Sequence, residues 1–142
     1  HWKIQKISVN SNQKIMNKLE NLIIDLAKAN KALKQATKLS PTRINKDASI
    51  QRFEFTFELA WKLMRGVLLY RGKEVNSPRM AIKEGFKEKF FEDGDGWIKM
   101  LDDRNLTSHT YKQDLAKEIY ENIKIKYYIL LKDLKEQMGQ IV

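Results

Sequence analysis

An arginine, an asparagine, a histidine and a tyrosine lie within eight positions of one another in the stretch DDRNLTSHTY, residues 102–111. The pair that can do chemistry together is Arg104 and His109. The planar guanidinium of arginine grips a phosphate through two parallel hydrogen bonds and stabilises the charge that builds on phosphorus. Histidine titrates near neutral pH and can move the proton of a ribose 2′-hydroxyl. This pair therefore suits cleavage of RNA by its own 2′-hydroxyl, which needs no metal ion.

Arg104 continues an apolar helical stripe, so its permanent charge must meet an anionic partner. An internal partner would be Glu54 or Glu58, on the charged strip of a neighbouring helix, and this carboxylate would orient the guanidinium. An external partner would be a phosphate. We expect Asp102 and Asp103 to point away from the stripe. The stripe consists of Trp97, Met100 and Leu101.

A break in the helix between Arg104 and His109 is needed if both side chains are to reach one target. In a continuous helix, residues five apart point about 140° away from each other. Thr110 and Gln113 fit the capping-box pattern, which predicts a new helix beginning at Tyr111. The free N–H groups at such a helix start favour an anion. The alternative is an ordinary polar turn, with the arginine in a structural ion pair and the histidine at a helix end.

Apolar residues recur at helical spacing along the chain, and no alternating strand pattern is present. The sequence therefore predicts an all-α fold, an up-and-down four-helix bundle with an additional short helix. We expect residues 1–142 to form a single domain with a core of about residues 14–138. The last long helix is predicted over residues 111–138.

Positive charge is concentrated in the first third of the chain. Residues 1–46 hold ten Lys or Arg against two Asp or Glu, whereas residues 47–142 hold 17 against 16. Such a basic segment suggests an acidic partner, either nucleic acid or an acidic protein. Lys31, Lys34 and Lys38 lie away from the apolar face of the first helix and are the predicted nucleic-acid contacts. The alternative is a solvated lysine-rich helix face.

Several functional classes are disfavoured by what the sequence lacks. Cysteine is absent, which excludes disulfides and thiolate metal sites and fits a reducing cytoplasm. His109 has no second His or Cys within reach, so we expect no metal site and no cofactor. No run of 18 apolar residues occurs, so we expect no membrane span.

Three stretches together resemble the HEPN (higher eukaryotes and prokaryotes nucleotide-binding) superfamily and, within it, small bacterial nucleotidyltransferase substrate-binding subunits. The family motif is Arg, four to six residues, His, any residue and Tyr. Here it is formed by Arg104, His109 and Tyr111, with the frequent asparagine after the arginine present as Asn105. The likeness covers about residues 14–138. The three stretches are RFEFTFELAWKLMRGVLLYRG, SPRMAIKEGF and GWIKMLDDRNLTSHTY.

The resemblance implies a homodimeric helical bundle that works with a minimal nucleotidyltransferase. In one role attached to such proteins, the domain is a metal-independent ribonuclease toxin. Arg104 and His109 then carry the cleavage, Asn105 supports them, and the transferase is the antitoxin that adenylylates Tyr111. In the other role, the protein is a non-catalytic subunit that presents substrate to the transferase. A third hypothesis, from charge alone, is a nucleic-acid-binding domain that uses the basic first helix.

Overall fold

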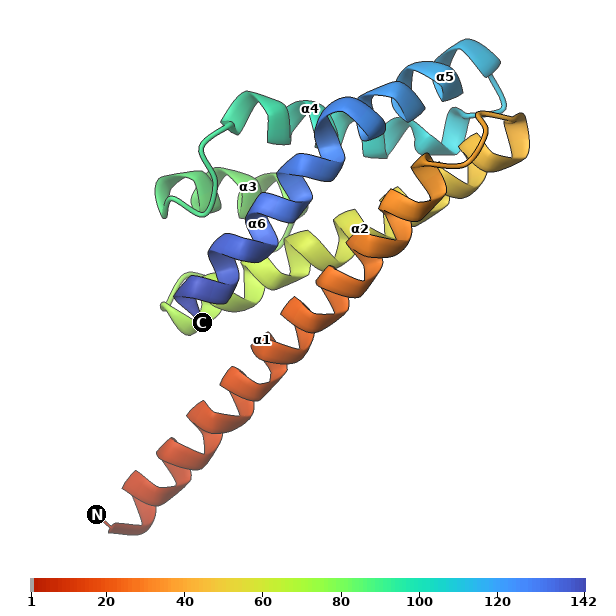
Figure 1. The fold of residues 1–142 in the computed structure, drawn as a ribbon. Coiled ribbons are helices and arrows are strands. Elements are labelled where there is room, and N and C mark those ends of the chain that lie inside the picture. Colours follow the sequence, from red (N-terminus) through yellow and green to blue (C-terminus); the bar gives the residue numbers. More distant parts are fainter. Residues whose placement is uncertain (1) are drawn as a thin grey trace.

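The computed structural model describes the backbone of residues 2–142 and the side chains of residues 11–142. The described part consists of helices joined by short connections and contains no strand, which confirms the all-α prediction (Figure 1). None of its helices is both long and apolar enough to cross a membrane. The elements in chain order are α1 (Trp2–Thr37), α2 (Arg43–Tyr70), α3 (Pro78–Lys87), α4 (Gly94–Leu106), η1 (Thr107–His109), α5 (Gln113–Asn122), η2 (Ile123–Tyr127) and α6 (Tyr128–Ile141).

Helix α2 is the centre of the bundle. It packs against α1, α3, α5 and α6, so most of its surface is covered. Burial of large apolar side chains on several sides of one helix is the main source of the fold's stability. The α2 side chains with no exposed surface include Phe53, Phe57, Leu63, Met64 and Leu68.

Helices α1 and α2 form a long antiparallel pair (Figure 1). Helix α1 ends at Thr37, shortly before Pro41, and the Oγ1 atom of Thr42 caps α2 by accepting the N–H of Asn45 at 3.2 Å. The N-terminal part of α1 extends beyond the rest of the bundle. Leu19 is the first buried side chain of the described part of α1.

The last three elements run on as one long helix, which includes a wider π-helical turn, η2 (Figure 1). The sequence predicts a single helix over residues 111–138, and the structure has Gln113–Ile141 with this turn inside it. A π turn changes the direction in which later side chains point, a change that helical spacing alone does not predict. Tyr127, the last residue of the turn, is buried and stacks on Phe53 with ring centroids 5.5 Å apart.

Helix α4 carries the first half of the DDRNLTSHTY stretch, and both its start and its apolar face are well anchored. Asp93 caps the helix, since its carboxylate accepts the N–H of Gly96 at 2.8 Å. This hydrogen bond, helped by the nearby ammonium of Lys126, holds the pKa of the Asp93 carboxyl below its usual value. The stripe of Trp97, Met100 and Leu101 is buried in the core, as predicted.

Candidate functional site

The guanidinium of Arg104 is held by a carboxylate from the central helix. Its Nη2 atom lies 2.9 Å from Oε2 of Glu58, and each side chain is about one-third exposed, at 34% and 33%. The Nη1 atom donates to Oδ1 of Asn105 at 3.5 Å. Of the two predicted internal partners, Glu58 is therefore the one in contact. Glu54 makes no ion pair with any of the described residues.

The predicted orientation of the last turn of α4 is wrong in one respect. Asp103 does not point away from the core: it is 7% exposed, whereas Arg104 lies at the margin of the bundle. The Asp103 carboxylate accepts hydrogen bonds from the Tyr127 hydroxyl and, at 3.0 Å, from the Asn122 side chain. Two donors from the last long helix thus draw a charged side chain inward, because a buried carboxylate is tolerated where it is hydrogen-bonded.

The Asp103–Tyr127 contact joins α4 to the π turn one residue before Arg104. Burial, together with the hydrogen bond to the Asp103 carboxylate, raises the pKa of the Tyr127 hydroxyl far above its usual value of 10.0. The hydroxyl is therefore a permanent donor over the physiological range. This contact fixes the end of α4, and with it the position from which the arginine side chain projects.

A break in the helix follows, as predicted, but it is built differently. Helix α4 ends at Leu106 and a 3-10 turn, η1, follows directly. The hydroxyl of Thr107 donates to the Arg104 carbonyl at 2.7 Å, and the hydroxyl of Thr110 donates to the Thr107 carbonyl at 3.0 Å. The predicted capping box is therefore wrong, since the Thr110 hydroxyl bonds to the preceding turn and does not cap α5. Helix α5 begins at Gln113 rather than Tyr111 and has no side-chain cap.

Arg43, at the start of α2, holds the connection from outside. Its Nη2 atom donates to the Thr110 carbonyl at 2.8 Å, across 67 positions of sequence, and its Nε atom pairs with Asp47 at 3.3 Å. Sequence reasoning did not identify Arg43, because nothing in its local pattern shows that the first turn of α2 lies beside residues 107–111. The burial of Asp103 was also not predicted, since the adjacent Asp102 has the same chemistry and only one of the two is buried.

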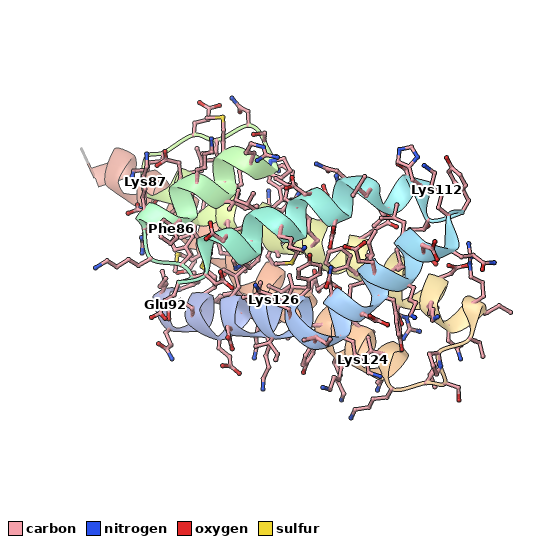
Figure 2. All side chains as sticks on the ribbon, turned by 90° about the horizontal axis from the view of Figure 1, so that it is seen from above. Phe86, Lys87, Glu92, Lys112, Lys124 and Lys126 are labelled. Carbon is pink, nitrogen blue, oxygen red and sulfur yellow. The ribbon has the colours of Figure 1, made fainter. Side chains whose placement is uncertain are left out.

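His109 and Tyr111 are both exposed at the end of the bundle where η1 leads into α5. Their ring centroids lie 6.1 Å apart with an interplanar angle of 70°. Tyr111 is 70% exposed. Figure 2 shows that the neighbouring Lys112 also lies at this end. Arg104 thus lies in the last turn of α4, and the exposed His109 is the last residue of the 3-10 turn that follows.

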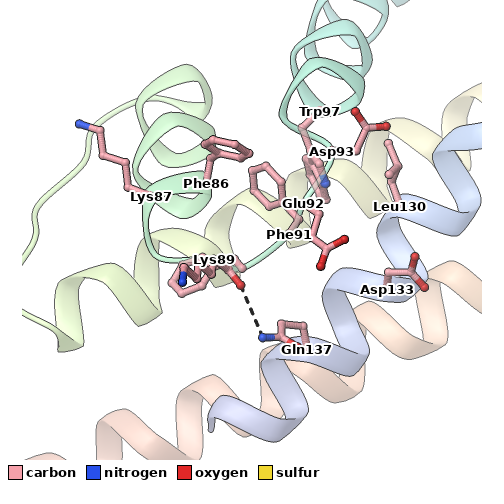
Figure 3. A pocket seen from close by; sticks show the side chains of 11 residues that line it. Phe86, Lys87, Lys89, Phe91, Glu92, Asp93, Trp97, Leu130, Asp133 and Gln137 are labelled. Atoms are coloured by element: carbon pink, nitrogen blue, oxygen red, sulfur yellow. Dashed lines mark hydrogen bonds between the residues drawn. The ribbon is translucent and has the colours of Figure 1, made fainter.

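A hollow lies away from the DDRNLTSHTY stretch, between the α3–α4 connection and α6 (Figure 3). It has a volume of about 980 Å³, and stacked Phe91 and Trp97 form part of its wall. Gln137 crosses one edge and donates to the Lys89 carbonyl at 3.5 Å. None of the residues of the DDRNLTSHTY stretch lines it. No group of three or more His, Cys, Asp or Glu side chains in the described part is arranged to hold a metal ion.

The chain is similar in sequence to known proteins over nearly its whole length. A family model described as nucleotidyltransferase substrate binding protein like matches residues 16–140. A protein from Haemophilus influenzae named probable ribonuclease HepT is 27% identical over 142 residues, covering 93% of this chain and 94% of that protein.

Two solved structures are similar in fold. A crystal structure of a protein from Thermus thermophilus has a TM-score of 0.75 and 33% identity, and the match covers 80% of this chain and 98% of that one. A Haemophilus influenzae structure, described as the fold of a substrate binding domain of a nucleotidyltransferase, has a TM-score of 0.64 and 25% identity, over 87% and 98% of the two chains. The resemblance found from the motifs is confirmed by these matches.

Proposed function

We propose that this chain is a metal-independent ribonuclease of the HEPN type. The premise is that it belongs to the family described as nucleotidyltransferase substrate binding protein like. Its activity is controlled by a partner nucleotidyltransferase. The observation that carries the proposal is the placement of Arg104, held by Glu58 at the end of α4, one 3-10 turn before the exposed His109. The likeness to a relative named as a probable ribonuclease supports it.

The proposed reaction uses the RNA's own nucleophile. His109 takes the proton of a ribose 2′-hydroxyl, and the resulting oxygen attacks the adjacent phosphorus. The bond from phosphorus to the 5′-oxygen breaks, so the products are a 2′,3′-cyclic phosphate and a 5′-hydroxyl that has gained a proton. Arg104 stabilises the negative charge that develops on the phosphoryl oxygens, and Asn105 supports the arginine through their contact.

A homodimer would complete the site. One imidazole takes a proton and a second group must return one to the leaving oxygen, yet each chain offers one histidine in this stretch. A two-fold axis through the exposed end of the bundle would bring two copies of Arg104 and His109 together in one cleft. The exposure of His109 and Tyr111 leaves this surface free to meet a second copy.

Tyr111 is the proposed control point. Its phenolic oxygen attacks the α-phosphorus of ATP bound to the transferase, pyrophosphate leaves, and an adenylyl group remains on the tyrosine. This adds a negatively charged phosphodiester and a nucleoside close to His109, since the two rings are 6.1 Å apart. The added charge can occupy the anion site and exclude RNA.

The decisive experiment compares purified, partner-free protein with its His109→Ala variant on single-stranded RNA, after intact mass has shown that Tyr111 is unmodified. We expect the wild type to cut RNA in the presence of a metal chelator and the variant to lose cleavage. We also expect His109→Ala to relieve growth arrest when the protein is expressed without its partner. Tyr111→Phe is the matched control: it should cut RNA and resist adenylylation. No cleavage by unmodified wild type would contradict the proposal.

A second candidate function is a non-catalytic subunit that holds substrate for the transferase. It is favoured by the family description and by the Haemophilus influenzae structure described as a substrate binding domain. A stable complex with the co-expressed transferase, together with loss of transferase activity when this chain is absent, would support it. A transferase that is fully active alone and forms no complex would exclude it.

A further inference from the structure

Helices α1 and α6 leave a groove of about 320 Å³ between them that is lined by positive charge. Five lysines and one tyrosine line it together with Ala27, Asn30 and Gln35, and none of the described residues that line it is Asp or Glu. On each helix the spacings of three or four residues keep these side chains on one face. We call these six residues the lysine groove: Lys31, Lys34 and Lys38 of α1, and Tyr128, Lys132 and Lys135 of α6.

None of the five lysines of the lysine groove forms an ion pair with a carboxylate of the described chain within 4 Å. Other lysines, such as Lys62, Lys73 and Lys126, do form such ion pairs. The ammonium of Lys34 instead lies 4.5 Å from the centroid of the Tyr128 ring, a cation–π contact. Five like charges along one groove, none of them in a close ion pair, favour an anionic ligand.

We infer that the lysine groove binds the phosphodiester backbone of single-stranded RNA, and so serves as a second contact for the substrate of the proposed ribonuclease, on which this inference rests. Lys31 and Lys38 are seven positions apart, which is about 10 Å along a helix. That length spans about three phosphates at one phosphate per about 3.4 Å of a stacked strand. A protein partner is less favoured, because the centres of protein interfaces are depleted in lysine and the groove offers few apolar side chains.

The groove also ends at the same end of the bundle as the start of α5 (Figure 1). Next to Lys38, the Thr37 carbonyl accepts the hydroxyl of Tyr120 at 3.4 Å, which ties this end of α1 to α5. Helix α5 begins just after His109 and Tyr111, and Figure 1 shows the end of α1 and the start of α5 at the same end of the bundle. A strand held by the lysine groove can therefore continue toward the exposed histidine.

Binding should be measured by fluorescence anisotropy with a labelled single-stranded oligouridine of about twelve nucleotides. All proteins carry His109→Ala, so that binding is followed without cleavage. The test variant is Lys132→Gln/Lys135→Gln, because only the structure assigns these two lysines to the groove. The matched control is Lys83→Gln/Lys99→Gln, which removes two exposed charges from α3 and α4, on the side of the bundle away from α1 (Figure 1).

We expect the test variant to bind roughly tenfold more weakly at about 0.1 M salt, with a salt slope shallower by about 1.4 for two lost phosphate contacts. Charge reversal at Lys31, Lys34 and Lys38 should weaken binding further. The control should bind like the parent, and all variants should keep its thermal unfolding midpoint. Equal binding by test and control variants would overturn the inference.

Two further outcomes separate this inference from the proposed ribonuclease. If wild-type protein cuts no RNA but the lysine substitutions still weaken binding, the ribonuclease proposal fails and the lysine groove stands as an RNA site. If RNA binding is unchanged by the substitutions while co-purification of an acidic protein is lost, the occupant is a protein and the inference is overturned.

Discussion

The Nη2 atom of Arg104 lies 2.9 Å from Oε2 of Glu58, so one edge of the guanidinium is fixed by the central helix while the side chain keeps about one-third of its surface exposed. Such an arrangement orients an arginine without covering it. Because both side chains are partly exposed, we expect the pair to contribute less than about 1 kcal/mol to the free energy of unfolding. Its importance under the proposed function is therefore in positioning.

The first prediction concerns this pair. Glu58→Gln should lower kcat for RNA cleavage by roughly 10- to 100-fold, because a displaced catalytic group loses its alignment with phosphorus. The KM for RNA and the thermal unfolding midpoint should change little. Lys62→Gln is the matched control, since it removes the other ion-pair partner of Glu58, at 3.7 Å, without touching Arg104. Wild-type cleavage rates in Glu58→Gln would show that the ion pair is only structural.

The second prediction concerns the buried carboxylate of Asp103. Tyr127→Phe removes one of its two hydrogen-bond donors and should lower the free energy of unfolding by about 1–3 kcal/mol, measured by urea titration. Tyr128→Phe is the control, because it deletes a neighbouring hydroxyl, and the tyrosine hydroxyls that hydrogen-bond within the described chain are those of Tyr120 and Tyr127. If both variants lose equal stability, the Tyr127 contact has no special role.

The third prediction concerns how the stabilisation by the Tyr127 hydroxyl changes at alkaline pH. The folded protein raises the pKa of Tyr127 above its usual value of 10.0, so the stabilisation is fully present below about pH 10 and is lost as the pH rises further. The stability gap between wild type and Tyr127→Phe should therefore narrow between about pH 9 and about pH 11, measured by urea titration at each pH. A gap that stays constant, or widens, over this range would contradict the assigned environment.

The fourth prediction concerns the arginine that holds the connection after α4. Arg43→Met removes the 2.8 Å bond to the Thr110 carbonyl, so amide hydrogen exchange should become faster in residues 107–112. Global stability should fall by less than about 1 kcal/mol, since Arg43 is exposed. Arg52→Met is the matched control: it removes an equally short bond, 2.8 Å to the Ala32 carbonyl, at a different place. Faster exchange in 107–112 in both variants would show a general effect instead.

Local sequence was sufficient for the helices and for the residue types at the site. The spacing of apolar side chains predicts helices along the whole chain and a long last helix, because a helix shows its buried face as a simple repeat along the chain. The motif of Arg104, His109 and Tyr111 is visible in the sequence because its members lie within eight positions of one another. The capping box at Thr110 was misread, because a threonine hydroxyl can serve either the helix before it or the one after it.

The sequence by itself determined an all-α chain, the break after Arg104 and a basic first helix. Only the tertiary structure decided that Glu58 rather than Glu54 holds the arginine, that Asp103 rather than Asp102 is buried, and that α6 adds two lysines to those of α1. The physical reason is that each of these outcomes depends on which surfaces of distant segments meet. Helical periodicity states which face of a helix is buried, but not what it is buried against.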